Sequence, residues 1–411
     1  MSSKAFKENE NYLYSKNGKS ERKKRDLKKS YPKFKTIDGK HFIRENIPEA
    51  YVPYQAKKRK NGRVKFFNFD LAREMGLIDK NHPDEMNEAL EKEILNSFSI
   101  TIINEYDLIN KVKIDPEDIL DRTYMATRYL QLQHPGRTGK TSGDGRSIWN
   151  GDFKGTHQDW DVSSCGSGAT CLSPATAIYK KFFKTGDKFV SYGCGHADYI
   201  DGISAAVMSE IFFKNKIKTE RTLAIIDYGT STINIRTGKN LLRPSHLFCH
   251  LKQGNRDVLK KIIDYYIDRE SKNENWPSFI NEKEKYKYFL DYVTHNFAHS
   301  TAVFESEYIF CWMDWDGDNI LMDGGIIDYG SVRQFGLFHH EYRYDDVERF
   351  STTILEQKNK AKYIVQNIIQ CVDFIETGKK RPLKNFSSST YLNKFDDIYQ
   401  REKKSRLLYK I

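Results

Sequence analysis

Apolar residues recur at helical spacing in the second half of the chain and in short runs in its first half. The sequence "DVLKKIIDYYIDRE" places four of them on one helical stripe, at Val258, Leu259, Ile262 and Ile263. A longer helical pattern runs from about Lys283 to Phe310, and "YDDVERFSTTILEQ" and "AKYIVQNIIQCVDFI" repeat it. This spacing predicts a mainly helical region after Gly254.

The first half of the chain has a different pattern of apolar residues, which is mainly strand-like. "GDGRSIWNGDF" and "DWDVSSCGSG" predict two strands, and "TLAIIDYG" and "NLLRPSHLFCHL" are also strand-like. "NFDLAREMGLID" predicts a short helix with a glycine stop, and "IDGISAAVMSEIFFKNKI" predicts a helix with Ile203, Val207 and Ile211 at four-residue spacing. Strands with few helices, followed mainly by helices, predict an α+β fold with a small mixed lobe at 66–250 and a larger helical lobe at 251–411.

Charge separates a leader from the rest of the 411-residue chain, whose net charge is +11. Residues 1–65 hold 20 Lys and Arg against 7 Asp and Glu, which leaves 47 against 49 for residues 66–411. The body is therefore near neutral, which is not typical of a nucleic-acid-binding surface. The leader is predicted to be solvated and partly disordered, and it could bind an acidic partner such as RNA, an acidic protein or a membrane surface.

Several classes of protein are excluded by what the sequence lacks. No apolar stretch approaches the length of a membrane span, and the start has no apolar segment typical of a signal peptide. The six cysteines form no CxxC pair, which indicates a reduced, cytoplasmic protein rather than a disulfide scaffold or a zinc site. His295 and His299 have zinc-protease spacing, but Asn296 stands where such an enzyme needs its glutamate base.

The stretch "GDNILMDGGIIDYG" at residues 317–330 is the strongest chemical motif. Its two apolar runs can pair as a hairpin around "DGG", which would bring Asn319 and Asp328 together. Their oxygens are the hard ligands that Mg²⁺ takes beside nucleotide phosphates, and Asp318 could accept a proton from an attacking hydroxyl. The alternative is a purely structural acidic hairpin. A calcium loop is excluded, because Asn319 and Gly325 occupy positions that require Gly and Glu.

Seven segments between about residues 68 and 340 occur in the order of motifs from one known family. They are "NFDLAREMGL", "GDGRSIWNGD", "WDVSSCGSGAT", "GCGHA", "TERTLAII", "RPSHL" and "GDNILMDGGIIDYG". The chain thereby resembles the selenoprotein O (YdiU) family, kinase-like proteins that transfer AMP from ATP to protein hydroxyls. The resemblance implies a protein-kinase-like two-lobed fold, with a small mixed N-lobe and a larger helical C-lobe. It also implies that the protein uses ATP together with Mg²⁺ or Mn²⁺. It also implies partner proteins that offer Ser, Thr or Tyr hydroxyls.

The resemblance also implies roles for individual residues. Asp318 falls on the catalytic base, and Asn319 and Asp328 fall on the metal ligands. Gly166 and Gly168 are expected to bind nucleotide, because glycines let backbone N–H groups approach phosphates.

The chain departs from the family where the nucleotide phosphates bind. The family lysine falls on Cys165 and its glutamate partner on Ala205, so no charge remains at either position. A family arginine becomes His196, and two others near the hinge become Leu241 and Phe248. The candidate replacement cations are Lys154, Lys180, Lys181 and Arg243, and we expect Arg243 to bind nucleotide.

Three functions remain open on the sequence. The leading one is a divergent protein adenylyltransferase. An enzyme with another transfer chemistry on the same kinase-like fold is an alternative to it. The second is a pseudoenzyme that binds nucleotide or a partner without turnover, which Cys165 and Ala205 favour. The third is an RNA-binding protein that uses the basic leader.

Overall fold

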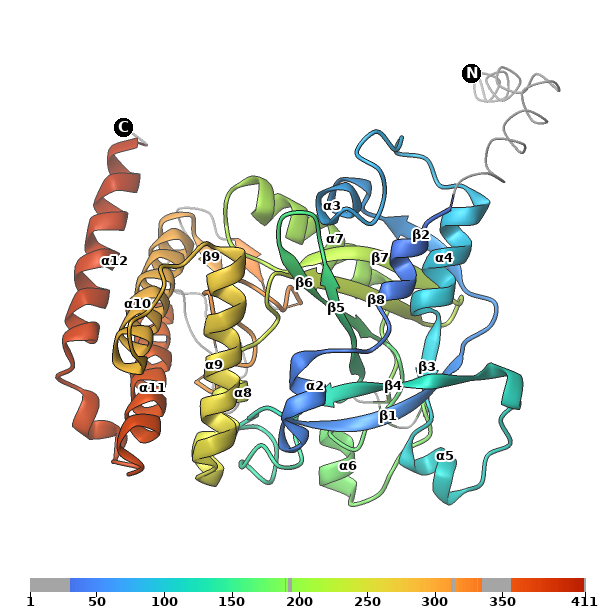
Figure 1. The fold of residues 1–411 in the computed structure, drawn as a ribbon, viewed down its shortest axis with the longest axis horizontal. Coiled ribbons are helices and arrows are strands. Elements are labelled where there is room, and N and C mark those ends of the chain that lie inside the picture. The colour runs from blue at the N-terminus through green and yellow to red at the C-terminus, as the bar shows by residue number, and fades with distance from the viewer. Residues whose placement is uncertain are drawn as a thin grey trace, which may run out of the picture.

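The computed structural model describes residues 30–188, 190, 194–311, 313, 315–330, 332–334 and 356–409. Within these residues the protein is a mixed α+β structure around one eight-stranded antiparallel sheet (Figure 1). The strands are β1 (Tyr51–Lys58), β2 (Arg63–Phe67), β3 (Ile100–Ile102), β4 (Ile119–Thr127), β5 (Ser147–Lys154), β6 (Asp159–Cys165), β7 (Arg221–Asp227) and β8 (Thr232–Gly238). Their order in the sheet is β2-β7-β8-β6-β5-β4-β1-β3. The predicted α+β class is therefore confirmed.

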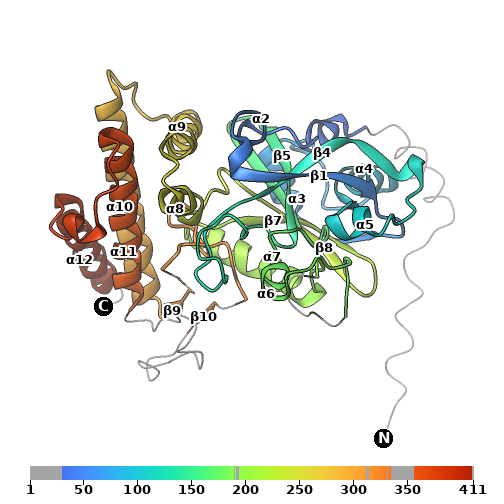
Figure 2. The ribbon, with the colours of Figure 1, turned by 90° about the horizontal axis from the view of Figure 1, so that it is seen from below.

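Helices surround the sheet and form a separate group beside it. Around the sheet are α2 (Phe42–Asn46), α3 (Phe69–Met75), α4 (Glu88–Phe98), α5 (Glu105–Ile109), α6 (Pro174–Tyr179) and α7 (Tyr199–Lys214). The second group comprises α8 (Pro244–Gln253), α9 (Arg256–Asn273), α10 (Glu282–Ser306), α11 (Gln357–Thr377) and α12 (Thr390–Tyr409). In two perpendicular views α8 and α9 lie next to the sheet, with α10, α11 and α12 beyond them (Figures 1 and 2).

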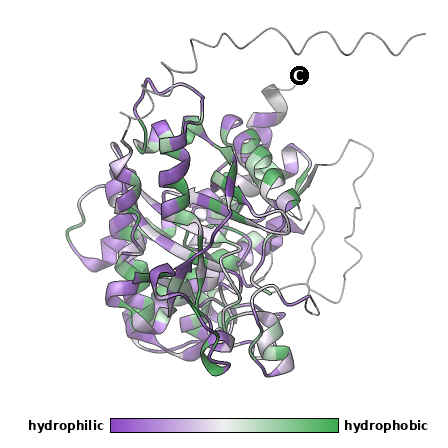
Figure 3. Cartoon of the chain, turned by 90° about the vertical axis from the view of Figure 1, so that its right-hand side faces the viewer, coloured by the Kyte–Doolittle hydropathy of each residue, from purple (hydrophilic) through white to green (hydrophobic). Residues whose placement is uncertain are grey.

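Most helices predicted from spacing are present. The whole apolar stripe from Val258 to Ile263 is buried in α9, and α10, α11 and α3 also match their predictions. Along the helices visible in Figure 3, hydrophilic and hydrophobic residues alternate, as amphipathic helices require. The helix predicted over "YDDVERFSTTILEQ" lies outside the described residues except for its last two.

One local prediction needs correction, and one confirmed helix has an unexpected orientation. "NLLRPSHLFCHL" is not a strand, because helix α8 runs from Pro244 to Gln253 and is capped by Gly254. The Arg243 N–H donates to His246 Nδ1 at 3.0 Å at its start, and proline at the first helical position is compatible with a helix. Helix α7 is present, but Val207 and Ile211 are exposed on it, so their spacing marks the solvent face.

The predicted leader is too long. Residues 30–65 belong to the fold, since β1 pairs with both β3 and β4, and β2 pairs with β7. Phe34, Ile37 and Ile47 in this segment are fully buried. Because lysines and arginines lie between these apolar positions, the sequence pattern did not reveal that residues 30–65 contribute to the core. Only residues 1–29 of the leader prediction lie outside the described part of the chain.

A buried ion network joins the helices to the sheet. Asp161 on β6 accepts hydrogen bonds from Arg269 Nη2 of α9 at 2.9 Å and from the Leu241 N–H at 2.8 Å. His41 Nε2 lies 3.4 Å from the same carboxylate. Burial alone would raise the pKa of Asp161, but Arg269 and His41 lower it below the usual range. The network therefore keeps the Asp161 carboxylate ionised although water does not reach it.

No helix among the described residues combines the length and apolar character needed to cross a bilayer.

Candidate functional site

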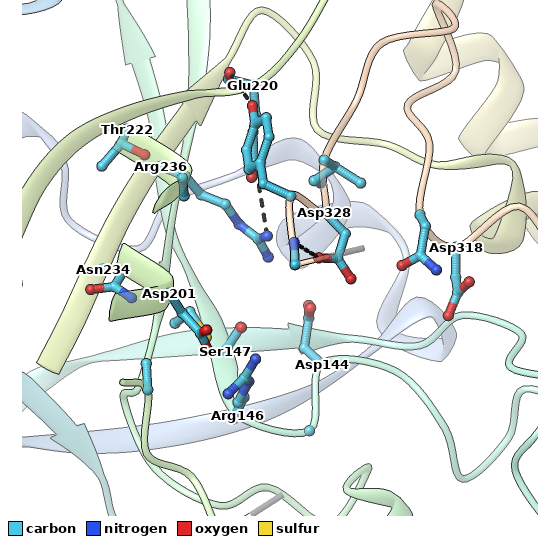
Figure 4. Close-up of a pocket in the computed structure, with 18 of the residues that line it drawn as sticks. Asp144, Arg146, Ser147, Asp201, Glu220, Thr222, Asn234, Arg236, Asp318 and Asp328 are labelled. Atoms are coloured by element: carbon cyan, nitrogen blue, oxygen red, sulfur yellow. Dashed lines mark hydrogen bonds and ion pairs between the residues drawn. The ribbon is translucent and has the colours of Figure 1, made fainter. Parts of the chain in front are cut away.

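A cavity of about 870 Å³ opens between the sheet and residues 318–332 (Figure 4). Its walls come from the β4–β5 loop, from β6, β7, β8 and α7, and from the start of α8. Six carboxylates and three guanidinium groups line it: Asp144, Asp198, Asp201, Glu220, Asp318 and Asp328, with Arg146, Arg236 and Arg243. The cavity is therefore rich in charge of both signs, with an excess of carboxylates.

The predicted hairpin is present and forms one wall of this cavity. Ile320 and Ile326 form an antiparallel bridge, and the Leu321 N–H donates to the Gly325 carbonyl at 2.7 Å. This tight return places Asp318, Asn319 and Asp328 in the lining of the same cavity. Gly324 has a φ of 76°, and a Cβ there would lie 2.8 Å from Ser300 Oγ, so the turn depends on glycine.

Asp318 is a buried carboxylate with incomplete hydrogen bonding. Its Oδ2 accepts a hydrogen bond from Gln131 Nε2 at 3.3 Å, whereas Oδ1 is buried with no hydrogen-bond partner among the described residues. Burial raises the pKa of Asp318, although the side chain of the neighbouring Asp316 and, after it, the charge of Arg243 act in the opposite direction. A buried oxygen without a partner is costly for the fold, so its presence fits a group that accepts a proton from a ligand.

Arg243 holds the loop that carries Asp318. Its Nη1 donates to the Asp318 carbonyl at 2.7 Å, and its guanidinium carbon lies 4.8 Å from the centre of the Tyr129 ring. Burial would lower the pKa of Arg243, but Tyr129 and Asp144 raise it above the usual range. The guanidinium therefore stays charged inside the protein and fixes the position of Asp318.

A chain of hydrogen bonds fixes Asp144 on the opposite wall. His246 Nδ1 accepts from the Arg243 N–H at 3.0 Å, so a neutral ring has its proton on Nε2, which lies 3.0 Å from Thr127 Oγ1. Burial lowers the pKa of His246 well below its usual range, which keeps the ring neutral. Thr127 Oγ1 in turn donates to Asp144 Oδ2 at 2.6 Å, and Trp149 Nε1 donates to the same oxygen at 3.1 Å.

The cavity suits a cation that arrives with phosphates. Among the described residues, no three His, Cys, Asp or Glu side chains could hold a metal ion by themselves. Mg²⁺ bound to a nucleotide needs only one or two carboxylates, because phosphates and waters supply its other oxygens. Asp328 is exposed toward the cavity, and its Oδ1 accepts a hydrogen bond from the Gly330 N–H at 2.9 Å. Asn319 and Asp328 thus fit a nucleotide-bound metal.

The two glycines expected to bind phosphate do not line the cavity. The Gly166 N–H donates to the Arg146 carbonyl at 2.9 Å, and the Gly168 N–H donates to the Gly195 carbonyl at 3.0 Å. A Cβ at Gly166 would lie 2.2 Å from the Thr232 carbonyl oxygen. Both glycines therefore serve close packing within the protein, and their N–H groups are not available to a ligand.

Two of the five departures from the family pattern lie in the wall of the cavity. Cys165 and Ala205 both line the cavity and bring no charge to it, whereas Leu241 and Phe248 belong to the hydrophobic core. His196 is half-buried, and burial lowers its pKa.

Three of the four candidate replacement cations lie elsewhere. Lys154, Lys180 and Lys181 are exposed and do not line the cavity, but Arg243 does. Sequence reasoning missed Arg146, Arg236 and Glu220, which also line it. Arg146 follows "GDG" in the quoted motif "GDGRSIWNGD", so the motif could have identified it as a candidate site residue. Glu220 lies in the quoted segment "TERTLAII", but nothing in the sequence pairs it with Arg236, which lies in no quoted motif.

Comparison with known proteins places this cavity in a family context. A family model described as "Protein adenylyltransferase SelO" matches residues 36–411. "Protein nucleotidyltransferase YdiU" of Shewanella loihica is 25% identical over 231 residues, which cover 54% of this chain and 43% of the relative. The protein of the same name from Shewanella pealeana is 26% identical over 219 residues, which cover 51% and 40%. The matches thus span less than half the length of these curated relatives.

Proposed function

The chain belongs to the SelO family, and from this we propose that it is a protein adenylyltransferase that uses ATP and a divalent metal ion. One observation carries the proposal: the hairpin puts Asp318, Asn319 and Asp328 into one cavity, where a buried oxygen of Asp318 has no hydrogen-bond partner within the part of the chain that the structure describes. The acceptor is a Ser, Thr or Tyr hydroxyl of another protein.

The reaction assigns each of these residues a task. Asp318 Oδ1 takes the proton of the acceptor hydroxyl, whose oxygen forms a bond to the α-phosphorus of ATP. The bond from the α-phosphorus to its bridging oxygen breaks, and pyrophosphate leaves with the electron pair. A metal ion held by Asn319 and Asp328 would offset the charge of the phosphates. Arg243 keeps Asp318 in place through the hydrogen bond to its carbonyl.

The proposal includes a kinase-like arrangement of two lobes, at 66–250 and 251–411. The cavity supports it, because its lining residues come from both sides of residue 250. The correction at residues 30–65 extends the first lobe toward the N-terminus.

A pseudoenzyme is the second candidate, and the neutral pair Cys165 and Ala205 favours it. Labelled ATP distinguishes the two. The protein is incubated with Mg²⁺ or Mn²⁺, a cell lysate, and ATP labelled on either its α- or its γ-phosphate. We expect the α-label alone in protein, because adenylyl transfer releases the γ-phosphate in pyrophosphate. The γ-label alone would indicate a kinase, and binding of ATP without either label would indicate a pseudoenzyme.

The metal assignment gives a separate prediction. We expect ATP to raise the melting temperature more with Mg²⁺ than with EDTA, because a ligand that binds only the folded state stabilises it. Asp328→Ala should remove this difference, and Asp323→Asn, in the same hairpin but outside the cavity, should preserve it. An undiminished metal-dependent shift in Asp328→Ala would exclude Asp328 as a ligand.

A further inference from the structure

Arg236 lies beside the position where the phosphate-binding lysine is missing. Strand β8 pairs with β6, and Arg236 stands opposite Ser163 in the register. Directly opposed residues share a face of an antiparallel sheet, and so do alternate residues of one strand. Arg236 therefore shares a face with Cys165, one strand away, and both line the cavity.

Glu220 supplies a carboxylate partner for this arginine. Its Oε2 lies 3.4 Å from Arg236 Nη1. The Glu220 N–H donates to the Ile326 carbonyl at 3.0 Å, and Tyr329 Oη donates to the Glu220 carbonyl at 2.9 Å. Both contacts tie Glu220 to the hairpin that carries Asp328. The ion pair is thus held between the sheet and the proposed metal-binding segment.

The guanidinium group retains donors for a ligand. Arg236 Nε is buried with no hydrogen-bond partner among the described residues, and its side chain keeps 18% of its surface exposed. Burial raises the pKa of Glu220 to about 7, although Arg236 and Arg243 act in the opposite direction. An ion pair in which the guanidinium has an unused N–H donor is incomplete, and an anion would complete it.

The other two arginines of the cavity are held by backbone carbonyls, although Arg243 Nε, like Arg236 Nε, is buried with no hydrogen-bond partner among the described residues. Arg243 Nη1 donates to the Asp318 carbonyl, and Arg146 Nη1 donates to the His196 carbonyl at 3.4 Å. Figure 4 shows Arg236 reaching into the cavity from its strand, with Glu220 and Asp328 around its guanidinium group. Arg236 is therefore the cation best placed for a phosphate near the proposed metal ligands.

We propose that Arg236 binds the phosphates of a metal–nucleoside triphosphate and that Glu220 positions it, so that this pair replaces the lysine and glutamate absent at Cys165 and Ala205. The inference rests on the proposed function, because it needs a nucleotide in the cavity. A planar guanidinium can contact two phosphate oxygens at once, which suits a cation that approaches from the neighbouring strand. The small neutral side chains of Cys165 and Ala205 leave the space in front of it open.

Equilibrium binding of Mg²⁺–ATP and of adenosine tests the proposal. Arg236→Met should weaken binding of ATP by about 10- to 100-fold, the usual effect of losing a hydrogen bond to a charged group. Adenosine binding should not change, because adenosine has no phosphate. Lys239→Met is the matched control: Lys239 is near the end of the same strand and pairs with Glu274, outside the cavity. Glu220→Gln should weaken ATP binding less than Arg236→Met does.

A reconstruction gives a second readout that a structural role would not produce. Cys165→Lys with Ala205→Glu, added to Arg236→Met, should recover part of the lost ATP affinity. Should Arg236→Met fail to fold, Arg236→Lys keeps the charge without the planar fork and should bind ATP with intermediate affinity. Unchanged ATP affinity in either variant would overturn the proposal, and so would equal losses for ATP and adenosine. A wild-type protein that binds no ATP would instead overturn the proposed function.

Discussion

Replacing Asp318 with asparagine is expected to reduce transfer of the α-label to protein by about 10²- to 10⁴-fold, the usual contribution of a positioned base. Asparagine has nearly the shape of aspartate and keeps an oxygen for Gln131 Nε2, but it cannot accept a proton from a hydroxyl. Arg243 contacts the backbone carbonyl of residue 318 and should keep that contact. The loss should therefore appear in kcat rather than in ATP affinity.

The melting temperature distinguishes this chemical role from a structural one. Burial raises the pKa of Asp318, so its ionised form costs the fold free energy at neutral pH. Asp318→Asn should then melt at the same temperature as the wild type or higher. Asp323→Asn is the control, since Asp323 belongs to the same hairpin, lies 3.9 Å from Lys218 Nζ and does not line the cavity. An Asp318→Asn protein that transfers α-label at the wild-type rate would exclude Asp318 as the base.

The hairpin was predictable because its information is local. Two apolar runs separated by "DGG" can pair with little choice of register, and Gly324 meets the demand of the turn. Pairing alone brings Asn319 and Asp328 together. The assignment of a metal site came from the order of several weak motifs along the chain, since no single motif decided between a metal site and an acidic hairpin.

The Glu220–Arg236 pair was beyond prediction for the opposite reason. Glu220 directly precedes β7 and Arg236 lies on β8, and they meet only because these two strands pair beneath α7. Gly202 of α7 approaches so closely that a Cβ there would lie 2.5 Å from Asn234 Oδ1. Such an approach depends on the packing of a helix on a sheet, which the spacing of residues in one sequence does not encode.

The two incorrect predictions about secondary structure and folding share a physical cause. "NLLRPSHLFCHL" has the apolar density of a buried strand, but α8 is buried on nearly all sides, so no polar face reveals the helical period. Residues 30–65 have the charge of a solvated tail, yet many of their apolar residues fill core sites while all but one of their lysines are exposed. In both segments the tertiary environment, rather than the local pattern, sets the structure.

The second large effect concerns the fold. We expect Arg269→Met to lower the free energy of unfolding by about 3–5 kcal/mol, because it leaves Asp161 buried without its main counter-charge. Asp161 has no exposed side-chain surface, so water cannot replace the guanidinium group. Urea denaturation at neutral pH measures the change. Lys272→Met is the matched control on α9: Lys272 pairs with Asp159, but 59% of its side chain is exposed, so its removal should cost less than about 1 kcal/mol.

Removing both charges separates the cost of an unpaired carboxylate from the loss of the arginine's packing. Asp161→Asn with Arg269→Met leaves no buried charge at this site, and asparagine can still accept the Leu241 N–H. The double variant should therefore be more stable than Arg269→Met alone, although one substitution has been added. If instead the two losses add, Arg269 stabilises the protein through packing and through its hydrogen bond from Nε to the Lys239 carbonyl. The ion network would then not be what joins α9 to the sheet.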